Sequence, residues 1–131
     1  MADPAFLLDA NICVYLLGGG ADVLRSRVED CEPGALVTSS IAFAEVLIGA
    51  VRRDGVAEAL ALFRAIPPLP FGSAEAEAYA RLPFRRGSFD RLIAAHAITL
   101  GLTLVTANEK HFAGVPNLNV ENWALPQEPT A

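Results

Sequence analysis

The sequence has few cysteines and no hydrophobic run long enough to cross a membrane. Its two cysteines, Cys13 and Cys31, are too few for a disulfide framework or a cysteine metal cluster, and Cys13 lies in an apolar segment that suits a reduced, buried thiol. The longest apolar tract, residues 92–106, is too short for a bilayer and contains His96 and Gly101. The first residues carry no signal-peptide pattern. We therefore expect a soluble, cytoplasmic protein without membrane contact.

Histidine and lysine are also scarce. Neither His96 nor His111 has a second histidine or a cysteine at a zinc-binding spacing. Lys110 is the only lysine, and the net charge of −5 argues against binding nucleic acid through bulk positive charge. The remaining basic residues are arginines, whose guanidinium groups suit local contacts with phosphate. A nuclease that holds a metal ion with acidic residues is still compatible with this composition.

The length and composition indicate one folded domain. The chain has 131 residues, of which 53% are hydrophobic and 19% charged, enough to bury a sizeable core. We assign residues 1–125 to a single domain and 126–131 to a flexible C-terminal tail.

Apolar runs alternate with segments of helical periodicity, separated by glycine and proline. Strands are expected at residues 6–8, 35–38, 69–71, 102–105 and 118–120, and helices at 11–17, 21–30, 41–53, 56–65, from 73 to before Pro83, and at 89–100. This alternation predicts an α/β fold of three layers, with a central parallel sheet of about five strands flanked by helices on both faces.

In such a sheet, strand C-termini and helix N-termini share one edge, and several acids fall there. Asp9 ends the first strand, Glu45 follows the second by one helical turn, and Asp90 opens the helix before the fourth. Each has an ordinary alternative: a helix cap for Asp9, an arginine pair for Glu45 and a favourable helix-dipole contact for Asp90. Together, three converging carboxylates favour a site for Mg²⁺ or Mn²⁺. The same edge receives Ser39, Thr106 and Asn108.

The helix 41–51 is apolar nearly all round. We predict that its core face is formed by Ile41, Ala44, Ile48 and Val51, with Glu45 on the same stripe. The apolar residues on its other sides then need a second cover, which is either deeper burial, a partner helix or a second copy of the chain.

Four segments, in this order and spacing, resemble the PIN-domain ribonucleases, and within them the VapC-type toxins of toxin–antitoxin pairs. They are LLDANICVYLL (7–17), SSIAFAEVLIG (39–49), FDRLIAAHAITLGLTLVTANEKHF (89–112) and VPNLNVENW (115–123). The resemblance implies a PIN-like fold and Mg²⁺- or Mn²⁺-dependent hydrolysis of RNA by a metal-activated water. It also implies a homodimer and inhibition by a VapB-like antitoxin that fills a groove.

The resemblance assigns roles to individual residues. It implies that Asp9, Glu45 and Asp90 bind the metal, and that Asn11, Ser39 and Thr106 orient them. Asn108 stands where many relatives carry a fourth acid, and we keep it in the catalytic set because its carbonyl oxygen can still bind a cation. Basic residues that flank the cleft are candidates for RNA contact, with solvated surface charge as the alternative: Arg85, Arg86, Arg91 and Lys110.

Two other functions compete with the ribonuclease. A catalytically weak or dead PIN-like module that binds RNA or an antitoxin is supported by Asn108. A haloacid-dehalogenase-like phosphatase would use Asp9 as nucleophile with Thr38, but that chemistry needs a second aspartate where Asn11 stands.

Overall fold

The chain folds around a sheet of five parallel strands. The computed structural model describes residues 1–19, 22–83 and 88–124. The strands are β1 (Phe6–Leu8), β2 (Leu36–Ser39), β3 (Pro68–Leu69), β4 (Thr103–Thr106) and β5 (Val120–Asn122), and they lie in the order β3-β2-β1-β4-β5. Every neighbouring pair is parallel. The predicted α/β fold with a five-stranded parallel sheet is therefore confirmed.

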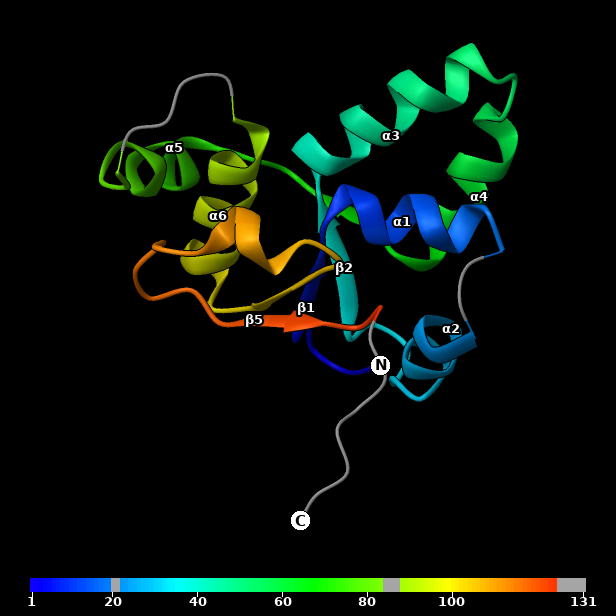
Figure 1. The fold of residues 1–131 in the computed structure, drawn as a ribbon, viewed down its shortest axis with the longest axis horizontal. Helices are drawn as coiled ribbons and strands as arrows, with labels where there is room; N and C mark the ends of the chain where they lie inside the picture. Colours follow the sequence, from blue (N-terminus) through cyan, green and yellow to red (C-terminus); the bar gives the residue numbers. More distant parts are fainter. Residues whose placement is uncertain (20–21, 84–87, 125–131) are drawn as a thin grey trace.

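Two groups of helices cover the sheet. They are α1 (Ala10–Leu17), α2 (Asp22–Glu29), α3 (Ser40–Arg52), α4 (Val56–Ala65), α5 (Ser73–Ala80) and α6 (Phe89–Leu100), with a 3₁₀ turn, η1 (Glu109–Phe112), before β5. Figure 1 shows α1, α3 and α4 gathered on one side of the strands and α5 with α6 on the other. Contacts among α1, α3 and α4, and between α5 and α6, agree with this division.

The sheet reverses its direction of growth at β1. From β1 the chain moves outward to β2 and β3, and then returns to place β4 on the other side of β1. Leu7 consequently pairs with Val37 on one side and Leu104 on the other, and none of the three is appreciably exposed. In open parallel sheets, the crevice beyond the strand C-termini at such a reversal is the usual ligand site. Here that position lies between the ends of β1 and β4.

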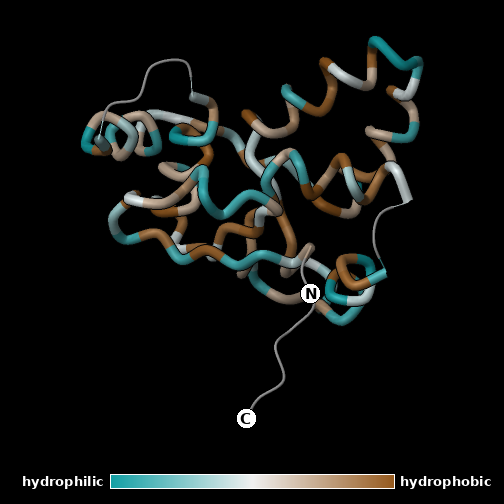
Figure 2. Tube along the Cα trace, viewed as in Figure 1, coloured by the Kyte–Doolittle hydropathy of each residue, from teal (hydrophilic) through white to brown (hydrophobic). Residues whose placement is uncertain are grey.

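The apolar strands form the core, and one tryptophan closes it. Leu8 and Val105 are fully buried, as expected for strands covered on both faces. Trp123 is also buried and packs edge-on against Phe6, with 5.0 Å between ring centroids. Figure 2 shows that the turn between α3 and α4 is one of several hydrophilic segments at the periphery of the fold.

The predicted core face of α3 is wrong. The buried residues are Ala42, Val46 and Ala50, whereas Ile48 and Val51 are 54% and 67% exposed. Because this helix is apolar on nearly every side, hydrophobic spacing alone does not select a face. The two alanines let the helix pack closely, while Ile41, Phe43 and Leu47 are half-buried against the core.

Other boundaries follow the prediction closely. The proline-rich segment forms only the two-residue edge strand β3, and β5 begins two positions later than expected. The predicted tail, residues 126–131, lies outside the described residues. No helix in the described part of the chain combines the length and apolar character needed to cross a membrane.

Candidate active site

Asp9 lies where β1 ends and α1 begins. Its backbone is extended, and its Oδ1 accepts a 2.8 Å hydrogen bond from the N–H of Ala10. The side chain is only 4% exposed. Burial raises the pKa of Asp9, and the nearby carboxylate of Asp90 acts in the same direction. Asp9 is thus both a helix cap and a carboxylate held in an environment that penalises its charge.

Thr106, at the end of β4, forms hydrogen bonds with several polar groups at the switch point. Its Oγ1 donates to Oδ2 of Asp9 at 2.9 Å, and accepts from Nδ2 of Asn11 at 3.3 Å and from the N–H of Asn108 at 3.0 Å. Asn11 also accepts, through Oδ1, from the N–H of Ala107 at 3.2 Å. These bonds hold Asp9 in one orientation and join the ends of β1 and β4.

Glu45 has a buried carboxylate oxygen without a hydrogen-bond partner in the described part of the chain. Its side chain is half-buried, and Oε1 is shielded from solvent without a hydrogen-bond partner among the described residues. Burial raises the pKa of Glu45 to about 7, and repulsion from the carboxylates of Asp9 and Asp90 adds to the shift. A buried, unpaired carboxylate oxygen is costly unless a cation or proton meets it.

Asp90 completes the acidic group. It is the second residue of α6, and its Oδ2 lies 3.3 Å from Nδ1 of His111 on η1. Its charge raises the pKa values of both Asp9 and Glu45. The three acids therefore come from three distant segments to one edge of the sheet, where their charges repel. The contact with His111 was not predicted, although its position shortly after Thr106 could have suggested it.

The carboxylate oxygens are of the type that binds a hard divalent cation, but among the described residues they do not form a complete set of ligands. Within residues 1–19, 22–83 and 88–124, no three His, Cys, Asp or Glu side chains are grouped closely enough to hold a metal ion as they stand. However, carboxylate oxygens are the ligands that Mg²⁺ and Mn²⁺ prefer, and Mg²⁺ commonly keeps several waters. The unpaired Oε1 of Glu45 is an acceptor that such an ion or its water would satisfy.

The described hydrogen bonds of Ser39 go to α3 and α6. Its Oγ accepts from the N–H of Ile41 at 3.1 Å, capping α3, and lies 2.8 Å from Nδ1 of His96. Both residues are fully buried, and burial lowers the pKa of His96. Their contact links α3 to α6, so the described hydrogen bonds give Ser39 a role in positioning helices rather than in orienting an acid.

The predicted RNA contacts are only partly placed. Arg91 is 8% exposed, and its Nε and Nη1 are buried without a hydrogen-bond partner within the described chain, so most of its guanidinium is withdrawn from the surface. Lys110 is exposed on η1 beside His111. Arg85 and Arg86 lie outside the described residues.

Asn108 is exposed, and its backbone is anchored to Thr106. The adjacent acid, Glu109, accepts at 3.4 Å from Nδ2 of Asn122 on β5. Glu109 thus engages β5 and does not replace the missing fourth acid.

Comparison with known proteins assigns the family. The model of the PIN domain matches residues 6–118. The chain belongs to the PIN-domain family. It is 30% identical over 130 residues to the tRNA(fMet)-specific endonuclease VapC of Shigella flexneri, covering 91% of this chain and 98% of that protein. It is 32% identical to ribonuclease VapC2 of Rickettsia felis, covering 90% and 97%.

Solved structures show the same PIN-domain architecture. The complex VapBC2 from Rickettsia felis, bound to a DNA fragment from its promoter, superimposes with a TM-score of 0.82 at 29% identity, covering 91% of this chain and 98% of that chain. VapBC-1 from nontypeable Haemophilus influenzae gives a TM-score of 0.79 at 25% identity, covering 92% and 99%. The predicted PIN-like fold is confirmed.

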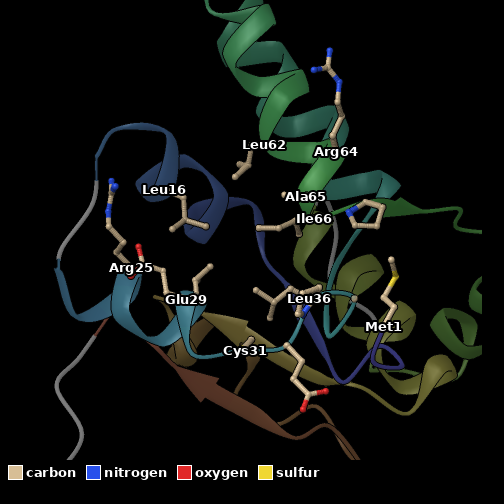
Figure 3. A pocket seen from close by; sticks show the side chains of 15 residues that line it. Met1, Leu16, Arg25, Glu29, Cys31, Leu36, Leu62, Arg64, Ala65 and Ile66 are labelled. Carbon is tan, nitrogen blue, oxygen red and sulfur yellow. The ribbon is translucent and has the colours of Figure 1, made fainter.

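This PIN domain also has an apolar groove, which lies at the end of the strands opposite to the acids. The groove has a volume of about 650 Å³ and lies among α1, α2, α4 and the start of β2. Figure 3 shows Leu16, Leu36 and Leu62 inside it, with Arg25, Glu29 and Arg64 around its mouth. Since Leu36 begins β2 whereas Asp9 follows the end of β1, the groove and the acids lie at opposite ends of the strands.

Proposed function

We propose that this chain is a Mg²⁺- or Mn²⁺-dependent endoribonuclease of the VapC type. The observation that carries the proposal is the convergence of Asp9, Glu45 and Asp90 at the switch point, with one oxygen of Glu45 buried and unpaired. Mutual repulsion of three carboxylates is tolerated when a cation balances it. The named ribonuclease relatives span nearly the whole chain.

Each acid has a part in the proposed reaction. Asp9, Glu45 and Asp90 would hold the ion, directly or through water, and the bound ion supplies an acidified water and a counter-charge for the phosphoryl oxygens. Thr106 and Asn11 fix the orientation of Asp9. One of the three carboxylates would also accept the proton of the attacking water.

The substrate is an RNA phosphodiester. Because a water attacks instead of the neighbouring 2′-hydroxyl, the products should carry 5′-phosphate and 3′-hydroxyl ends. One relative is named as specific for tRNA(fMet), so initiator tRNA is the first substrate to test. Lys110, exposed on η1 next to His111, would contact the RNA backbone, and Arg85 and Arg86 stay candidates for the same role.

The decisive experiment neutralises single acids. Asp9→Asn and Asp90→Asn should abolish RNA cleavage that depends on Mg²⁺ or Mn²⁺, while circular dichroism and the unfolding midpoint show a retained fold. The exposed Asp30→Asn is the matched control and should cleave normally. Full activity in either active-site variant would refute the proposal.

We further propose that a VapB-like antitoxin occupies the groove around Leu62. Solved relatives are VapBC complexes, and this groove offers an apolar floor with charges of both signs at its mouth. An amphipathic segment with acidic residues facing Arg25 and Arg64 would suit it. Co-expression with the neighbouring reading frame should yield a complex that is inactive on RNA.

We also propose that the chain forms a homodimer and that the outer face of α3 is its interface. Ala44, Ile48 and Val51 lie one turn apart on this face and are exposed. Large apolar side chains exposed along one face of a helix are typical of protein interfaces.

A PIN-like module without catalytic activity is the alternative. It is favoured by Asn108 and by the absence, within the described chain, of a finished metal cage. A titration with Mn²⁺ distinguishes the two, because a dead module should bind none at this edge. The phosphatase alternative loses support, since Thr38 is fully buried and donates to the carbonyl of Leu8 at 2.6 Å.

A further inference from the structure

Phe89 is an exposed aromatic residue directly beside an active-site acid. It is the first residue of α6, immediately before Asp90, and its side chain is 54% exposed. The other phenylalanines in the described chain, Phe6, Phe43, Phe63, Phe71 and Phe112, are buried or half-buried. Four of them pack against other aromatic rings or an imidazole, namely Phe6, Phe43, Phe63 and Phe71. Among the phenylalanines that the structure describes, Phe89 alone is largely exposed to solvent.

The helix geometry directs this ring toward the acidic edge. Phe89 precedes Ile93 by four residues and His96 by seven, so it continues their buried stripe. Side chains on a helix tilt toward its N-terminus, and the N-terminus of α6 is the end that carries Asp90. The ring therefore extends past the core at the edge where the carboxylates meet. Core packing does not account for it.

We infer that Phe89 stacks on the base of a nucleotide next to the scissile phosphate, and that the substrate is unpaired at that position. The inference rests on the proposed ribonuclease function and names a positioning residue for it. An aromatic ring accepts any base by stacking, but a base held in a duplex cannot offer its face. Because Phe89 and Asp90 both lie in the first turn of α6, we expect the stacked base to belong to a nucleotide close to the cut.

The first experiment measures RNA binding without cleavage. In an Asp9→Asn background, a short labelled unstructured RNA should bind Phe89→Ala roughly 5- to 150-fold more weakly than the parent. Phe89→Leu should be as weak as Phe89→Ala, whereas Phe89→Trp should bind like the parent. Leu100→Ala, which removes an exposed apolar side chain at the far end of α6, is the matched control and should change nothing.

The second experiment locates the stacked base. Once the cut in a single-stranded RNA is mapped, an abasic substitution at one flanking nucleotide should raise KM for the otherwise wild-type enzyme and leave kcat nearly unchanged. The same substitution should add little to Phe89→Ala, because the two changes remove one contact. Pairing the cut region with a complementary strand should suppress cleavage.

The outcomes separate the two proposals. If the wild-type chain binds and cuts RNA but Phe89→Ala behaves normally, or Phe89→Leu is as good as the parent, stacking is refuted and the ribonuclease stands. Independent, additive effects of Phe89→Ala and the abasic site would also refute stacking. If Phe89→Ala weakens only the antitoxin complex or the dimer, the ring belongs to a protein interface. If the wild-type chain binds no RNA, both proposals fall.

Discussion

The hydroxyl of Thr106 donates a 2.9 Å hydrogen bond to Oδ2 of Asp9, although the two residues are 97 positions apart in the chain. This bond lowers the pKa of Asp9 against the effect of burial. The same hydroxyl accepts from Asn11 and from the backbone of Asn108. One threonine thus connects the central acid to the two neighbouring polar residues.

Removing that hydroxyl should weaken metal binding. Thr106→Val keeps the shape but leaves Oδ2 of Asp9 without its donor, so the carboxylate becomes harder to ionise. Loss of a group that orients a ligand typically costs about 10- to 100-fold in metal affinity or activity. Isothermal titration with Mn²⁺ and a cleavage assay should both show this loss, and Thr106→Ser should restore most of it. Unchanged affinity in Thr106→Val would contradict the role.

Glu45 should make the metal-free protein less stable as the pH rises. Its pKa is raised from 4.5 to about 7 by folding, so the folded chain holds this proton more tightly than the unfolded chain. The resulting stabilisation is fully present below about pH 4.5 and is lost as the pH rises through about 7. Unfolding midpoints measured in chelator should therefore fall over this range by a few degrees.

Glu45→Gln isolates this contribution. His96, whose pKa is lowered by burial, acts in the opposite direction, so the informative quantity is the difference between wild type and variant. The variant should be relatively more stable at pH 8 and lose the Mn²⁺-induced stabilisation. A difference that does not vary with pH would contradict the raised pKa.

Charged residues on α3 should dissociate the proposed dimer. Ile48→Asp and Val51→Asp place carboxylates on the exposed apolar face and should give monomers by light scattering, with the unfolding midpoint changed little. Leu100→Asp, on α6, is the control and should leave the mass unchanged. A wild-type chain that is monomeric at micromolar concentration would count against the interface.

The groove can be probed through its own cysteine. Cys31 lines the groove, whereas Cys13 is fully buried and has a pKa raised to about 12, so iodoacetamide should modify Cys31 alone. Co-expressed antitoxin should slow this reaction. Leu62→Asp should weaken the complex at least about tenfold, by analogy with buried interface anchors. Leu60→Asp, on the exposed side of the same helix, should not.

Restoring an acid at position 108 should add a cation site. Asn108 provides no charge, and Glu109 engages Asn122 instead. In Asn108→Asp, a second Mn²⁺ should bind at lower concentration than in wild type, as measured by titration calorimetry. The additional repulsion should also destabilise the metal-free variant slightly. Equal stoichiometry and affinity in both proteins would show that residue 108 does not face the cation.

Much of the fold could be predicted because the residues that begin and end its strands and helices act locally. Apolar runs such as Phe6–Leu8, ended by glycine, proline or a capping residue, define the strands, and their alternation with helices requires a parallel sheet. That topology alone brings Asp9 and Asp90 to one edge. The order of strands and helices along the chain was therefore enough to predict that the three carboxylates share one edge of the sheet.

The remaining features depend on packing that the sequence does not display. The buried face of α3 could not be predicted because the helix is apolar around its circumference. Ser39 was expected beside the acids, but its short side chain is used by the cap of α3 and by His96, a residue 57 positions away. The unpaired oxygen of Glu45 and the contact of His111 with Asp90 likewise arise only from the assembled helices.

The order of residues along the chain determines which of the two sites is completely synthesised first. All residues that line the groove precede residue 68, whereas the acidic site needs Asp90 and Thr106. Until β4 is synthesised, β1 lacks its second neighbour and Asp9 lacks its donor. A growing chain therefore contains every residue of the proposed antitoxin groove before it contains Asp90 and Thr106 of the proposed catalytic site.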